Sequence, residues 1–90
     1  MQKGKIVEIL KRVTLRHGIK KAFLFGSFAR GEKYRDIDLA IEPPDGFTLL
    51  DLSRVANEIN EKIGIEVDLI TTRSIHPLLK KAIQRDMVAI

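Results

Sequence analysis

Two short segments of this chain, residues 36–42 and 65–70, have an apolar residue at every second position and mostly polar residues between them. A period of two is typical of a β-strand that buries one face, because successive side chains of a strand point to opposite sides of the sheet. The polar positions include Asp36 and Asp38 in the first segment and Asp68 in the second. The pattern therefore predicts two strands that cover a core with one face and carry carboxylates on the other.

Helical periodicity surrounds these two segments. Apolar residues that recur at helical spacing predict a helix over roughly residues 3–16, with a basic outer face and with Gly18 as its C-terminal cap. A second helix is expected to begin at a capping box on Thr48, with an aspartate in place of the usual glutamate, and to end at Gly64. Pro77 suits the first turn of a last helix.

The remaining segments complete an alternating order of helices and strands. The glycine-bounded apolar run from Ile19 to Phe25 predicts a strand covered on both faces, and Met87–Ile90 predicts a short final strand. Because helices and strands alternate along the chain without a linker or a repeat, we expect an α/β fold. A chain of 90 residues can build one small core, so residues 1–90 are expected to form a single domain.

Composition excludes several kinds of site. The sequence contains no cysteine, which rules out disulfides, thiolate zinc sites and cysteine nucleophiles. No apolar run approaches the roughly 18 residues that span a bilayer, and the start of the chain lacks the pattern of a signal peptide. We therefore expect no membrane contact and a cytoplasmic location. The net charge of +4 favours a polyanionic partner only weakly, because the cations are spread over the helices.

A glycine–serine turn follows the first predicted strand and shortly precedes the aspartates. Gly26 would let backbone approach a phosphate group closely, and Ser27 is a candidate N-cap for a short helix through Arg30. The N–H groups at the start of a helix bind anionic oxygens, while the Ser27 hydroxyl can add a hydrogen bond and Arg30 a charge. Such turns are common wherever a strand enters a helix, so the turn alone is a weak signal.

The aspartates supply the second half of a candidate catalytic site. Residues two apart on a strand lie about 6.5 Å apart on one face, so Asp36 and Asp38 can direct their carboxylates to one point, where Mg²⁺ would compensate their charge. Asp68 on a second strand would add a third carboxylate, enough for one or two Mg²⁺ ions in a phosphoryl transfer, and would help to take the acceptor's proton. Glu66 is the alternative ligand on that strand. Taken alone, an Asp-x-Asp strand is more often a solvated edge.

Together these motifs resemble the signature of the nucleotidyltransferase superfamily, which includes kanamycin nucleotidyltransferase and DNA polymerase beta. The segment GSFARGEKYRDIDL, followed later by EVDLI, is similar to the minimal nucleotidyltransferases, small proteins of about this length. The resemblance implies the nucleotidyltransferase fold, a small mixed sheet of three to four strands flanked by about four helices. It also implies that Gly26 and Ser27 bind phosphate and that Asp36, Asp38 and Asp68 bind metal.

The same resemblance implies a reaction and a partner. Minimal nucleotidyltransferases are often paired with HEPN-domain proteins, and such members are thought to be antitoxins that transfer AMP from ATP to a tyrosine of a HEPN ribonuclease. We therefore expect an ATP-using enzyme that forms a hetero-oligomer with a HEPN toxin and offers an open half-cleft as its site. Arg35 stands where a serine is common in the family, and whether it contacts phosphate or pairs with Asp36 stays open.

Two other functions stay open on the sequence alone. The same fold could neutralise its partner as a binding module without chemistry, or the positive charge could serve RNA binding or RNA-end modification. Several residues also have plain structural interpretations. His17 is expected to cap the first helix and His76 to enter the last one, whereas Tyr34 either packs in its loop or contacts a ligand. Three aromatic residues are expected in the core: Phe23, Phe25 and Phe28.

Overall fold

The computed structural model describes residues 1–90 and confirms the alternating order of helices and strands. Its elements are, in chain order, α1 (Lys3–Arg16), β1 (Lys21–Phe25), α2 (Gly26–Ala29), β2 (Ile37–Glu42), α3 (Leu49–Ile63), β3 (Val67–Thr71), the short 3₁₀ helix η1 (Thr72–Ser74), α4 (Pro77–Asp86) and β4 (Val88–Ala89). The α/β prediction, with a sheet of four strands and four α-helices, is therefore correct.

The four strands form one mixed sheet in the order β3-β2-β1-β4. Strand β1 pairs antiparallel with both β2 and β4, whereas β2 and β3 run parallel. In this register Asp38 of β2 has Phe25 as its neighbour on β1 and Asp68 as its neighbour on β3. Since cross-strand neighbours share a face of the sheet, the two aspartates lie side by side at the end of β1 from which Gly26 leaves.

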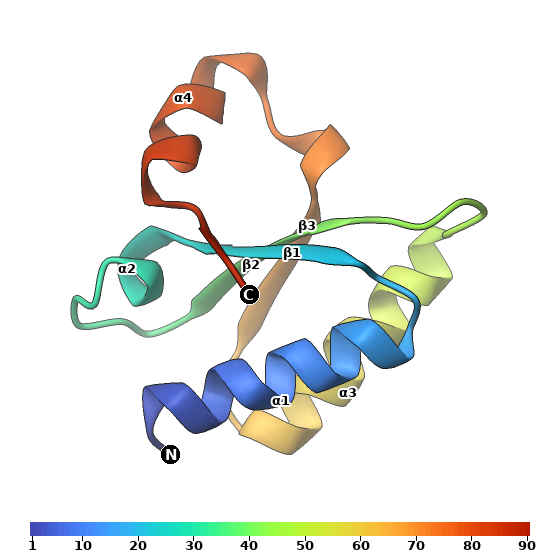
Figure 1. Ribbon diagram of the computed structural model, residues 1–90, viewed down its shortest axis with the longest axis horizontal. Coiled ribbons are helices and arrows are strands. Elements are labelled where there is room, and N and C mark those ends of the chain that lie inside the picture. The colour runs from blue at the N-terminus through green and yellow to red at the C-terminus, as the bar shows by residue number, and fades with distance from the viewer.

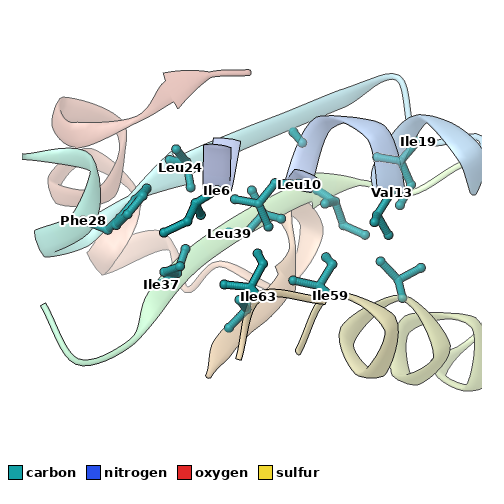
Figure 2. Close-up of a cluster of buried hydrophobic side chains, with 14 residues drawn as sticks. Ile6, Leu10, Val13, Ile19, Leu24, Phe28, Ile37, Leu39, Ile59 and Ile63 are labelled. Carbon is teal, nitrogen blue, oxygen red and sulfur yellow. The ribbon is translucent and has the colours of Figure 1, made fainter. Parts of the chain in front are cut away.

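Helices α1 and α3 both cover one face of the sheet (Figure 1). Their apolar stripes, Ile6, Leu10 and Val13 on α1 and Ile59 and Ile63 on α3, meet the apolar face of the strands in a core of 14 buried residues. Figure 2 shows these side chains between the two helices and the sheet. The helical and strand periods in the sequence therefore identified the core correctly.

The opposite face of the sheet is only partly covered. Helix α4 lies on this side, away from α1 and α3 (Figure 1), and it buries none of its own residues. Leu78 and Leu79 of α4 are exposed. The acidic ends of β2 and β3 therefore remain accessible. None of the helices combines the length and the apolar character that crossing a bilayer requires.

The predicted helix ends are well reproduced. The Thr48 side chain accepts a hydrogen bond from the backbone N–H of Asp51, whose carboxylate accepts one from the backbone N–H of Thr48, so the capping box is confirmed. Gly64 ends α3 in the left-handed conformation. At the start of α4, Nδ1 of His76 accepts a hydrogen bond from the N–H of Leu78, which confirms His76 as the residue of helix entry.

Two expectations about the first strand and its turn were wrong. Strand β1 alternates between buried and half-buried residues and is not covered on both faces: Phe23 and Phe25 are half-buried on the open side, and only Phe28 joins the core. Ser27 does not cap α2, because the helix already begins at Gly26 and no side chain caps it. The left-handed φ of Gly26 turns the chain directly from strand into helix.

Two strand starts also differ from the prediction. Strand β2 begins at Ile37, so Asp36 lies just before the strand, and β3 begins at Val67. The backbone N–H of Ile37 donates to the carbonyl of Glu66 at 3.0 Å, and this bond joins the two strands where both begin. Both residues that precede the strands, Asp36 and Glu66, are exposed.

Candidate active site

Gly26 brings the chain into direct contact with Asp38. Its φ is +73°, in the region that favours glycine, and a Cβ at this position would overlap Oδ2 of Asp38 and lie 3.2 Å from its Cγ. Because Phe25 is the cross-strand neighbour of Asp38, the residue that follows Phe25 must pass against the carboxylate. A glycine is therefore required for both the turn and the close approach.

Two aspartates on β2 and β3, and one that directly precedes β2, lie at this end of the sheet. Asp38 is half-buried, whereas Asp36 and Asp68 are exposed. Asp38 and Asp68 are register neighbours, and Asp36 precedes Asp38 by two residues at the start of β2. The structure thus places at one end of β2 and β3 the three aspartates that the sequence singled out. Asp68, and not Glu66, is the β3 residue directly beside Asp38.

The pKa of Asp38 reflects its burial and the charges beside it. Burial raises the pKa of its carboxyl, and the negative charges of Asp68 and Asp36 raise it further. The positive charge of Arg30 acts in the opposite direction and lowers it. The carboxylate form of Asp38 is therefore less favoured in the folded protein than in the unfolded chain, and a bound cation would offset the repulsion.

Ser27 lies in α2 and Arg30 directly follows this helix. Ser27 is half-buried and is the second residue of α2, and the backbone N–H of Arg30 closes the short helix on the carbonyl of Gly26 at 3.1 Å. The Arg30 guanidinium donates from Nη1 to Oδ2 of Asp86 at 2.7 Å and from Nε to Oε1 of Glu32 at 3.0 Å. These hydrogen bonds raise the pKa of Arg30.

The acidic side chains do not form a finished metal site. No group of three or more acidic or histidine side chains in the structure is arranged to hold a metal ion. The donor chemistry nevertheless fits Mg²⁺, which prefers oxygen ligands and binds through one or two carboxylates together with substrate phosphates. The repulsion of Asp38 by Asp68 and Asp36 also favours a bound cation. The residues therefore suit a cation that arrives with a nucleotide.

The site lies on an open surface. None of the four hollows of the structure is lined by Gly26, Ser27 or the three aspartates. The largest, about 410 Å³, lies between Gly18 and Asp45 and is lined by Lys21 and Glu42, which pair at the opposite end of β1 and β2. The half-cleft expected at these residues is therefore not one of the four hollows.

Other residues of interest have structural contacts. The ring of Tyr34 meets that of Phe28 edge to face at 4.7 Å between centroids, so Tyr34 packs on the core. His17 is the C-cap residue of α1, and its Nε2 lies 3.2 Å from Oε1 of Glu58. Arg35 is exposed. The sequence analysis missed Asp86, whose contact with Arg30 spans 56 residues and has no local signal in the sequence.

Comparison with known proteins identifies the family. The model of the nucleotidyltransferase domain family matches residues 5–90. The chain belongs to the nucleotidyltransferase domain family. A protein of Methanocaldococcus jannaschii, provisionally named a protein adenylyltransferase, is 48% identical over 88 residues, which cover 96% of this chain and 90% of the relative. The resemblance drawn from the sequence motifs is therefore correct.

Solved nucleotidyltransferase structures have the same fold. One, provisionally identified as a minimal nucleotidyltransferase, superimposes with a TM-score of 0.85 and 29% identity over 100% of this chain and 97% of its own. The chain thus has the fold of a minimal nucleotidyltransferase.

Two more distant structures share the fold at 23% identity each. A toxin–antitoxin structure with AMP-PNP has a TM-score of 0.72 over 99% of this chain and 72% of its own. A complex of a tri-AMPylated HEPN toxin of Shewanella oneidensis with its MNT antitoxin has a TM-score of 0.65 over 97% of this chain and 66% of its own. At this identity the similarity establishes the architecture only.

Proposed function

We propose that this nucleotidyltransferase transfers AMP from ATP to a tyrosine hydroxyl of a partner HEPN toxin and so acts as its antitoxin. The observation that carries the proposal is the contact of Gly26 with Asp38, directly beside Asp68. A turn that suits phosphate and a cluster of carboxylates that suits a cation lie at one edge of the sheet, as a nucleotidyl transfer needs. The names of the relatives support the same activity.

The chain's own residues divide the work as follows. Gly26 and Ser27 bind the triphosphate, and Arg30 neutralises part of its charge. Asp36, Asp38 and Asp68 would hold one or two Mg²⁺ ions. A bound metal would stabilise the negative charge that develops on the phosphoryl oxygens. The site presents these groups on an open edge, which suits an acceptor as large as a folded protein.

The reaction breaks one bond to phosphorus and forms another. The acceptor oxygen forms a bond to the α-phosphorus of ATP. The bond from the α-phosphorus to the oxygen that bridges the α- and β-phosphates breaks, and pyrophosphate leaves. Asp68 accepts the proton of the acceptor hydroxyl, since it lies beside Asp38 and is exposed to the approaching side chain. The mass of the acceptor therefore grows by one AMP for each transfer.

The test uses the native protein, ATP, Mg²⁺ and a HEPN-domain protein encoded beside it. Intact-mass spectrometry should show AMP on the HEPN protein, and no AMP when Asp38→Ala replaces the native enzyme. A HEPN protein that stays unmodified with the native enzyme contradicts the proposal. If its ribonuclease activity is nevertheless blocked without ATP and with all three aspartates replaced, the chain is a binding module instead.

A further inference from the structure

The contact between Arg30 and Asp86 is the feature of the structure that the reaction above leaves unused. Asp86 is the last residue of α4, and Arg30 directly follows α2. Their hydrogen bond of 2.7 Å joins residues 56 positions apart, the longest separation of any side-chain hydrogen bond in the structure. It ties the C-terminal helix to the turn that carries Gly26 and Ser27.

The contact between Arg30 and Asp86 is expected to contribute little to the stability of the fold. The Arg30 and Asp86 side chains are 41% and 26% exposed, and ion pairs this accessible to water contribute little to folding. Helix α4 has no buried residue, and its C-terminal end is continued by β4, which pairs with β1. The end of α4 is thus already anchored to the sheet, close to the candidate site.

For nucleotide binding, what matters is where the ion pair holds the Arg30 side chain. The backbone N–H of Arg30 donates to the carbonyl of Gly26 at 3.1 Å, so Arg30 is held directly after the short helix that carries Gly26 and Ser27. An unrestrained arginine side chain at a surface samples many rotamers, and ordering it on binding costs free energy. Asp86 and Glu32 hold two of its nitrogens and leave further N–H groups free, in the fork geometry that fits phosphate oxygens.

We propose that Asp86 is a positioning residue for nucleotide binding: its carboxylate holds the Arg30 guanidinium beside the Gly26 turn, so that the free N–H groups of Arg30 meet the triphosphate already ordered. The inference rests on the proposed function, because it takes Arg30 as a ligand of the nucleotide. It adds a residue from α4 that touches neither the nucleotide nor the acceptor. The opposite role, in which Asp86 competes with phosphate for Arg30, predicts the opposite sign in the following test.

The experiment measures the dissociation constant of a nonhydrolysable ATP analogue with Mg²⁺, by calorimetry, for the native protein and its variants. Asp86→Ala should weaken binding about two- to tenfold, the penalty of ordering one long side chain on binding. Arg30→Ala should weaken it about tenfold or more, since hydrogen bonds to charged groups are lost. In the Arg30→Ala variant, adding Asp86→Ala should not change the affinity further. With Arg30 in place, Asp86→Glu should bind the analogue more tightly than Asp86→Ala does, because glutamate keeps the carboxylate.

A matched control separates positioning from folding. Glu8→Ala removes another exposed ion pair, that of Glu8 with Arg12 at 2.7 Å on α1, and should leave nucleotide affinity unchanged. A purely structural Asp86 would lower the melting temperature without changing nucleotide affinity, and that result overturns the inference. Unchanged or tighter binding by Asp86→Ala overturns it too, while leaving the proposed function intact. A native protein that binds no ATP analogue overturns both.

Discussion

Replacing Gly26 by alanine should separate the stability of the protein from its activity. The φ of +73° costs an alanine about 1–2 kcal/mol, which for a chain of 90 residues lowers the melting temperature by about 4–16 °C. The new Cβ would overlap Oδ2 of Asp38 and lie 3.2 Å from its Cγ, so the whole Asp38 side chain must rotate away from position 26, at a cost that adds to that of the backbone. The rotated carboxylate no longer lies where the nucleotide needs it, and activity should fall about 10- to 100-fold.

Gly46→Ala is the matched control for this prediction. Gly46 has a φ of +77° and nothing within 4 Å of an added Cβ, so it carries the same backbone cost without the contact. The assay is AMP transfer at a temperature where circular dichroism shows both variants folded. Gly26→Ala should keep only about one-tenth to one-hundredth of the native activity there, and Gly46→Ala should match the native rate. Equal activities of the two variants would refute the claim that Gly26 positions Asp38.

Further predictions concern the charges of the site and one helix cap. The folded-state pKa of Asp38 is raised, so in the absence of metal the folded protein binds a proton at Asp38 more tightly than the unfolded chain does. At neutral pH, where Asp38 is ionised, this lowers the free energy of unfolding. The loss disappears as the pH falls toward about 4. Asp38→Asn should therefore melt higher than the native protein at pH 7 in EDTA, and the gap should close toward pH 4; a gap that widens on acidification contradicts this. Mg²⁺ at ten times its dissociation constant should stabilise the native protein by about 1.4 kcal/mol, EDTA should reverse the effect, and Asp38→Asn should lose it. Thr48→Ala breaks the capping box of α3 and should cost about 1 kcal/mol in urea unfolding at an unchanged rate of AMP transfer, since α3 lies on the other face of the sheet.

Local periodicity and helix ends account for most of what the sequence predicts about the fold. The stripe of α1, the capping box at Thr48 and the left-handed Gly64 each depend on residues a few positions apart, and all are reproduced. The prediction that β1 is covered on both faces was wrong because that cover depends on α4, which buries none of its own residues and leaves Phe23 and Phe25 half-buried. The sequence of a strand does not determine how well a helix far along the chain covers it.

In the candidate site too, the residues found from the sequence are those that depend on local spacing. Asp36, Asp38 and Gly26 were singled out by local spacing, and the sheet register brings Asp68 beside Asp38. The N-cap predicted for Ser27 was wrong, since a left-handed glycine can start the helix without a cap. Asp86 could not be found from the sequence, because its contact with Arg30 depends on how α4 folds back over the sheet.

The central claim is that this edge of the sheet moves the α-phosphate of ATP, with its nucleoside, onto a protein. The most direct measurement incubates the native protein and the HEPN protein with Mg²⁺ and ATP labelled either in the α- or in the γ-phosphate. The account predicts that the HEPN protein gains the α-label and none of the γ-label, and that Asp38→Ala abolishes the transfer. Transfer of the γ-label, or α-labelling that survives Asp38→Ala, would contradict it.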